Sequence, residues 1–182
     1  LYADSGLAGS CNDYNPGTRQ CASGAVRAAP TVSAGLQLLS PGDTLVLMPG
    51  TYGTIRPPRS GRADAPITVR GLAATPVRIE SGREVALWLV DRSWITIANL
   101  DIVEPEGFGR LEAATGIVID NVRFSDARAS GTTGALKFVR SSGNRVTNSS
   151  FDGGSDLLLL QDDSNQNLIA GNTFGRSEHS LV

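Results

Sequence analysis

Ile97-Ala98-Asn99-Leu100-Asp101-Ile102 is the first of four short segments that share one pattern. Each segment begins with a β-branched residue, carries an Asn (or Gly followed by Asn) two places later, and closes on a bulky apolar residue five places after the first. The other copies are residues 119–124, 146–151 and 169–174. Their closing residues lie 22, 27 and 23 positions apart along the chain. A repeat of this length is typical of one coil of a solenoid.

Strand-forming segments fill the chain before and between the repeats. Runs with period-two alternation, or rich in strand formers, cover residues 44–48, 51–52, 67–70, 77–80, 86–90 and 94–97. Such alternation places one face of each strand inside. Short turns of Gly, Pro, Ser and Asp separate the runs, and no helical segment among them is long enough for a βαβ crossover. The pattern predicts an all-β fold of about six coils over residues 44–182.

The repeated asparagines suit the corners between strands. Asn tolerates the left-handed backbone conformation that a tight corner needs. The amides of Asn99, Asn121 and Asn148 would also stand about 4.8 Å apart on stacked coils. We expect these three side chains to form an internal hydrogen-bonded ladder.

Residues 31–39 form the one credible helix. Thr31 is a good N-cap, and Val32, Leu36 and Leu39 share one face. We expect this short helix to cap the open N-terminal end of the solenoid, where an exposed β edge would otherwise invite pairing. Residues 1–4 read as an edge strand. Residues 1–43 therefore form an N-terminal part of a single domain.

Bulk composition excludes some partners. The 182 residues carry a formal net charge of −2, which gives no electrostatic case for nucleic acid or an anionic membrane. No apolar run approaches the ~20 residues of a membrane span. Gly (21 residues) and Pro (9) are abundant, as many turns require. Lys137 is the only lysine in the chain.

Cys11 and Cys21 are the only cysteines, and they flank a polar loop with a turn at Asn15-Pro16-Gly17. This arrangement predicts a disulfide, with two free thiols as the alternative. A disulfide implies an oxidising compartment, so we expect a secreted or extracellular protein, with the cell surface or periplasm included. The chain begins without Met or a signal peptide, which suggests a mature or trimmed form.

Several segments resemble a known superfamily. Residues 40–52, Ser-Pro-Gly-Asp-Thr-Leu-Val-Leu-Met-Pro-Gly-Thr-Tyr, resemble the opening of right-handed parallel β-helix proteins of the pectate-lyase-like superfamily. Residues 13–18 and 63–70 resemble segments before and after that opening. The resemblance implies a right-handed parallel β-helix that continues or is capped beyond Val182. It leaves function open, because the scaffold hosts lyases, hydrolases, epimerases, adhesins and phage spikes.

A lyase of this superfamily needs a group that neutralises the uronate carboxylate and a base for the C5 proton, often a Lys or Arg. Lys137 and Arg140 lie in a strand-like segment. Counting back from Phe151 and Phe174 places Arg140 beside Asp163 on the next coil, as a surface ion pair or as part of a site. We take Lys137, Arg140 and Asp163 as candidate catalytic residues. By the same count Lys137 faces Leu160, so no basic partner follows it.

Other polar residues are candidates for binding. Gln161, Asp162 and Phe108 are expected to contact substrate. Asp156, Asp162 and Asp163 form the densest acidic cluster, which is either a solvated turn or a Ca²⁺ site. A glycoside hydrolase would instead need two or three carboxylates on adjacent coils.

Two functions stay open at this point. The first is a secreted protein that binds or cleaves an acidic polysaccharide, as a lyase or a hydrolase. The second is a non-catalytic structural or adhesive β-helix that self-associates through an uncapped C-terminal edge. Two long connections, residues 104–115 and 125–133, are expected to bulge from one face and shape the binding surface.

Overall fold

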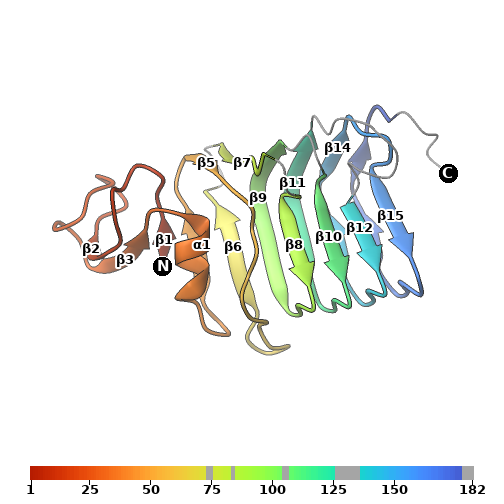
Figure 1. The fold of residues 1–182 in the computed structure, drawn as a ribbon, viewed down its shortest axis with the longest axis horizontal. Helices are drawn as coiled ribbons and strands as arrows, with labels where there is room; N and C mark the ends of the chain where they lie inside the picture. The colour runs from red at the N-terminus through yellow and green to blue at the C-terminus, as the bar shows by residue number, and fades with distance from the viewer. Residues whose placement is uncertain (73–75, 83–84, 104–106, 126–135, 178–182) are drawn as a thin grey trace.

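The computed structural model of the protein describes residues 1–72, 76–82, 85–103, 107–125 and 136–177. In these residues the chain is a β-solenoid of about six turns, with coils stacked along the long axis of the molecule (Figure 1). Neighbouring strands of successive coils pair in parallel, and the antiparallel pair of named strands lies in the N-terminal part. The all-β class and the coil number are therefore confirmed.

The coils contribute strands to three faces. The first face holds β4 (Thr44–Leu47), β6 (Ile67–Gly71), the first parts of β9 (Ile95–Val103) and β11 (Val118–Ser125), β13 (Arg145–Thr147) and β16 (Leu168–Ala170). The second face holds β5 (Gly50–Tyr52), β7 (Val77–Ile79), the second parts of β9 and β11, β14 (Ser150–Asp152) and β17 (Thr173–Phe174). The third face is a separate sheet of β8 (Leu87–Val90), β10 (Gly109–Glu112), β12 (Leu136–Val139) and β15 (Leu158–Gln161).

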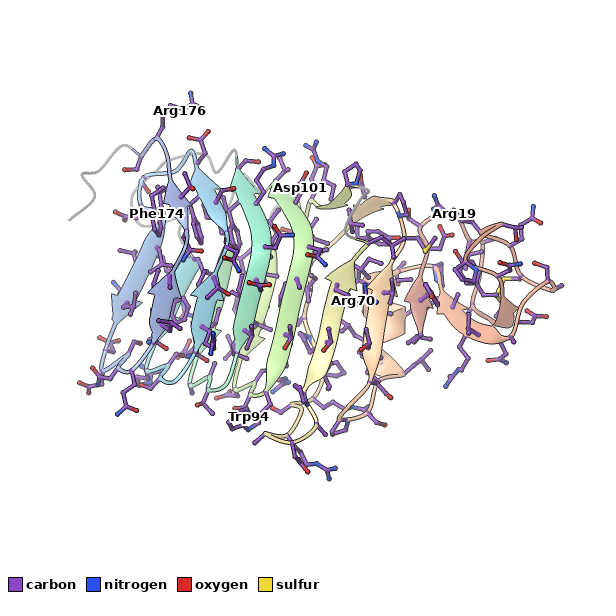
Figure 2. All side chains as sticks on the ribbon, turned by 180° about the vertical axis from the view of Figure 1, so that it is seen from behind. Arg19, Arg70, Trp94, Asp101, Phe174 and Arg176 are labelled. Atoms are coloured by element: carbon purple, nitrogen blue, oxygen red, sulfur yellow. A yellow bond between two sulfur atoms is a disulfide. The ribbon has the colours of Figure 1, made fainter. Side chains whose placement is uncertain are left out.

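The repeat seen in the sequence is the register of the first two faces. Ile97, Ile119, Val146 and Ile169 pair across neighbouring strands, and so do the closing residues Ile102, Phe124, Phe151 and Phe174. Figure 2 shows these strands side by side from behind, with Trp94 at the turn before β9 and Asp101 farther along that strand. One repeat is therefore one turn of the solenoid.

Asparagines do form the corner between the first and second faces. Asn99, Asn121 and Asn148 have φ of 57°, 52° and 53°, and Gly171 has 67°. The ladder is only partly as predicted. Asn121 Nδ2 donates to Asn99 Oδ1 at 2.8 Å, but Asn148 Nδ2 donates to Asp120 Oδ1 at 2.8 Å. The side chains of Asn121 and Asn148 are exposed, because this corner directs them outward, so the predicted internal position was wrong.

Aromatic rings stack through the interior along the coils. The rings of Phe124 and Phe151 are 4.6 Å apart and nearly parallel, and Phe174 follows Phe151 at 5.1 Å. Phe108 lies 5.2 Å from Phe124 and is fully buried. The prediction that Phe108 contacts substrate was therefore wrong, because its side chain completes the core.

The predicted connection over residues 104–115 contains a strand. β10 lies within it and pairs with β8 and β12 on either side. Gly109-Arg110-Leu111-Glu112 has a single bulky apolar residue, so its alternation gives a weak strand signal. The second predicted loop, residues 125–133, lies outside the described residues after Ser125.

The N-terminal part adds strands to the first face. The helix α1 (Val32–Gln37) is shorter than predicted. Thr31 is its N-cap as predicted, because Thr31 Oγ1 accepts the Ala34 N–H at 3.1 Å. β1 (Tyr2–Ala3) pairs with β4 on one side and β3 (Val26–Ala29) on the other. It is therefore an interior strand and not the predicted edge, because the chain returns through β3 to cover it.

A buried carboxylate fastens the disulfide loop to this end. Cys11, at the start of β2 (Cys11–Tyr14), is joined to Cys21 as predicted. Asp4, 1% exposed, accepts hydrogen bonds from Tyr14 Oη at 2.6 Å and Arg19 Nε at 2.9 Å. Arg19 lies at this end in Figure 2. The hydrogen bond from Arg19 is the main cause that lowers the pKa of Asp4 to about 2.

Within the described residues, no helix has the length and apolar character needed to cross a membrane.

Candidate functional site

The outward side of the third face carries a row of cationic and aromatic side chains. β8, β10, β12 and β15 lie side by side in Figure 1, and their register aligns Trp88, Arg110, Lys137 and Leu159. Their neighbours Leu87, Leu89, Leu111 and Phe138 are fully buried. Because successive side chains of a strand alternate between faces, the aligned row points to solvent. We call it the third-face row.

Arg56 extends this row by one coil toward the N-terminus. Ile55 bridges to Leu87 as an isolated parallel partner, which places Arg56 next to Trp88. The guanidinium carbon of Arg56 lies 5.1 Å from the centroid of the Trp88 ring, a cation–π contact. The third-face row therefore reads Arg56, Trp88, Arg110, Lys137 and Leu159 across five coils.

Lys137 has a basic partner on the preceding coil. The residue that follows it in the register is Leu159, one place from the predicted Leu160, and it is likewise apolar. The residue that precedes it is Arg110. Counting only toward the C-terminus missed this pair. The signal that could have found it is the matching alternation of Arg110-Leu111-Glu112 and Lys137-Phe138-Val139.

Lys137 sits in an environment that favours its neutral form. Its side chain is half-buried. Burial lowers the pKa of Lys137, the nearby charge of Arg110 lowers it further, and Asp156 acts in the opposite direction. A lysine with a lowered pKa is a better general base, since more of it is unprotonated at a given pH.

Glu112 links two arginines beside this pair. Arg110 Nε donates to Glu112 Oε2 at 2.7 Å, and Arg140 forms an ion pair with Glu112 Oε1. These contacts lower the pKa of Glu112, with the hydrogen bond from Arg110 the largest cause. Sequence reasoning did not single out Glu112. Its role follows from the register, which puts it one coil before Val139 and beside the turn at Arg140.

Arg140 approaches Asp162, and the predicted neighbour Asp163 lies one residue too far along. Arg140 Nη1 is 3.9 Å from Asp162 Oδ2. The turn after β15 has one residue more than the turn after β12, and Asp162 and Asp163 both have positive φ, of 49° and 60°. This extra residue shifts by one the position that is reached by counting back from Phe174. Arg140 is exposed and serves as an outer partner of Glu112.

The remaining predicted residues lie around the row. Gln161 aligns with Val139 and Glu112 but is exposed at the last described coil, and Asp163 is exposed in the turn. The three candidate calcium ligands do not gather. In the described part of the chain, the one group of three ligand atoms within 4.8 Å is Cys11, Asp13 and Cys21, whose sulfurs form the disulfide. Asp156, Asp162 and Asp163 do not form such a group among the described residues, and Ca²⁺ binding there stays a prediction.

The arrangement does not suit hydrolysis by two carboxylates. On the outward positions of the four described third-face strands, Glu112 is the single acid. Its lowered pKa keeps it ionised, whereas a general acid needs a raised pKa. A lysine with lowered pKa next to an arginine is instead a pairing that can serve proton abstraction beside a carboxylate, with the lysine as base and the arginine opposite the negative charge.

Comparisons with known proteins agree with the solenoid. No protein-family model matches the chain, and no curated protein matches it. Among solved structures, the chain is similar to an alginate lyase from Paenibacillus sp. str. FPU-7, with a TM-score of 0.59 and 22% identity. The match covers 80% of this chain and 56% of that enzyme, so the chain spans about half of the length of that protein. At this identity the similarity shows the fold alone.

Proposed function

We propose that the protein binds an acidic polysaccharide along the third face and cleaves it by β-elimination, with Lys137 as the base and Arg110 as the group that neutralises the uronate carboxylate. The observation that carries the proposal is the alignment of Arg110 and Lys137 on β10 and β12. Adjacent strands lie about 4.8 Å apart, so the two cations can reach one sugar ring together.

The chemical step conserves atoms and charge with these two side chains. The neutral amine of Lys137 takes the proton from C5 of the uronate. The electron pair of that C–H bond forms the C4–C5 double bond as the C4–O glycosidic bond breaks. The leaving oxygen then takes a proton from the Lys137 ammonium. Arg110 stabilises the negative charge that builds on the carboxylate in the transition state.

Glu112 is a positioning residue in this proposal. Its two oxygens hold Arg110 on one side and Arg140 on the other. A guanidinium has five N–H donors, so Arg110 can bind Glu112 and still present donors to a substrate carboxylate. Its fixed orientation lowers the cost of binding the transition state.

The proposal includes the finer features that the superfamily resemblance implies. We infer a right-handed coil, with α1 covering its N-terminal end, where it packs against β1, β3 and β4. We also infer an extracellular location, which the Cys11–Cys21 disulfide supports. The activity test includes Ca²⁺, because the superfamily resemblance implies that a metal ion can help to neutralise the substrate carboxylate.

The test follows the ultraviolet absorbance of the unsaturated product on alginate, pectin and glycosaminoglycans, with added Ca²⁺ and with a chelator. We expect absorbance to rise on at least one uronate polymer, and Lys137→Ala to abolish the rise. Arg145→Ala, which removes one cation from the first face, is the matched control and should keep the activity. No rise on any polymer would overturn the proposal and favour the non-catalytic alternative, an adhesive solenoid that self-associates at its C-terminal edge.

A further inference from the structure

A hollow lies at the N-terminal end of the third-face row, between α1 and β8. It has a volume of about 480 Å³. The residues that line it and matter here are Trp88, Arg56, Pro58, Arg92, Asp91 and Gln37. Most of its lining surface is polar, and the apolar part includes the indole of Trp88 and a proline ring. The proposed chemistry at Lys137 and Arg110 does not use this hollow.

Arg56 is arranged to bind an anion. Its side chain is exposed, and it takes part in none of the ion pairs found among the described residues. Arg110 and Arg140, in contrast, share Glu112. A guanidinium that stacks on an aromatic face keeps its N–H donors in its own plane, where they can pair with a carboxylate. Trp88 therefore orients Arg56 without neutralising it.

The other charged groups of the hollow leave it net positive. Arg92 Nε donates to the Pro57 carbonyl at 2.8 Å, and its Nη1 donates to the Asp91 carbonyl at 2.8 Å. Both acceptors are neutral carbonyls, so neither balances the positive charge of Arg92. The bond to Pro57 also holds the segment that carries Arg56. Asp91 is the one acid in the lining. Two arginines against one aspartate favour an anionic ligand.

The hollow is in line with the proposed site of cleavage. Trp88 precedes Arg110 by one strand and Lys137 by two. At about 4.8 Å per strand this is roughly 10 Å, a distance that a polysaccharide spans with a few rings. A chain that lies across β8, β10 and β12 with one uronate over Lys137 would bring another ring to Trp88.

We propose that this hollow is a distal subsite for an acidic sugar, in which the indole of Trp88 and Pro58 pack against the pyranose ring and Arg56 binds its carboxylate. The inference rests on the proposed function for the direction of the polymer, but it concerns binding and not cleavage. It implies that a polymer with carboxylates on successive rings engages the row at Arg56 and at Arg110 together.

The test measures binding apart from chemistry. In a Lys137→Ala background, which prevents cleavage, alginate and polygalacturonate are titrated by calorimetry at two salt concentrations. Arg56→Ala and Trp88→Leu are each expected to weaken binding of at least one polymer by about tenfold, the effect of losing one contact of ~1.4 kcal/mol. Arg56→Ala should also reduce the salt dependence. Arg145→Ala, which changes net charge equally on another face, should leave binding unchanged. Trp88→Phe should retain most of the affinity, and thermal melts check that each variant is folded.

The outcomes separate this subsite from the proposed reaction. Selective losses in Arg56→Ala and Trp88→Leu support the subsite, even where the parent protein binds without cleaving. Cleavage by the parent protein with binding that neither variant weakens more than Arg145→Ala does would overturn the subsite alone. Failure of the Lys137→Ala protein to bind either polymer would also overturn it.

Discussion

Arg110 and Lys137 hold the same position on neighbouring strands, and the charge of Arg110 adds to burial in lowering the pKa of Lys137. The base in the proposed reaction must be unprotonated. Activity should therefore rise with pH as Lys137 loses its proton, and the rise should come at a lower pH than for an ordinary lysine. The pH dependence of kcat/KM measures this directly.

Two variants should move that pH profile in opposite directions. Arg110→Gln removes a charge that lowers the pKa of Lys137, so the rise should shift to higher pH, apart from any loss of rate. Asp156→Asn removes a charge that raises the pKa of Lys137, so its rise should shift to lower pH. A profile that neither change moves would show that Lys137 is not the titrating base.

Glu112 offers a test of positioning that is separate from chemistry. Glu112→Gln keeps one acceptor oxygen but loses the charge that binds Arg110 and Arg140. We expect kcat/KM to fall by about tenfold while the protein stays folded, because Arg110 is less well fixed. Arg78→Ala breaks a more exposed pair with Glu80 on the second face and should leave kcat/KM unchanged. An equal loss in both variants would argue against a positioning role.

The strands and corners of the coils could be predicted from the sequence because they repeat. Each opening Ile or Val and each closing Ile or Phe falls at a register position that the spacing along the sequence can reveal. The Asn corners repeat with the same spacing. Burial of Phe108 was missed because an aromatic residue outside the repeat gives no sign of which face it occupies. Local pattern fixes strands better than it fixes loops and turns.

The site was only partly predictable for the same reason. Lys137 was found because it is the single lysine, but its partner Arg110 lies on β10, a short strand with one bulky apolar residue. Arg140 was assigned to Asp163 and approaches Asp162, because one extra residue in a turn shifts every later position. The cation–π contact of Arg56 with Trp88 joins residues on different coils, and their spacing does not follow the repeat.

The lowered pKa of Asp4 makes the stability of the N-terminal end depend on acid. Its folded pKa of about 2 lies below its ordinary value of 3.8, so its stabilisation is complete above the ordinary value and is lost as pH falls through the folded value. The shift corresponds to ~2 kcal/mol of unfolding free energy. Asp4→Asn should remove about this amount near neutral pH and flatten the acid dependence in denaturant titrations. Asp64→Asn, at an exposed and weakly paired position, is the control.

Phe151 allows a test of how much packing between neighbouring coils contributes to stability. Its ring lies between Phe124 and Phe174 and is 1% exposed, whereas Phe174 at the last described coil is half-buried. Phe151→Ala should cost about 3–5 kcal/mol of unfolding free energy, since it leaves a cavity between two stacked rings. Phe174→Ala should cost clearly less, because one side of its ring has no such neighbour among the described residues. Urea titrations of the two variants give the comparison. Equal losses would contradict the idea that packing between two rings sets the cost of removing Phe151.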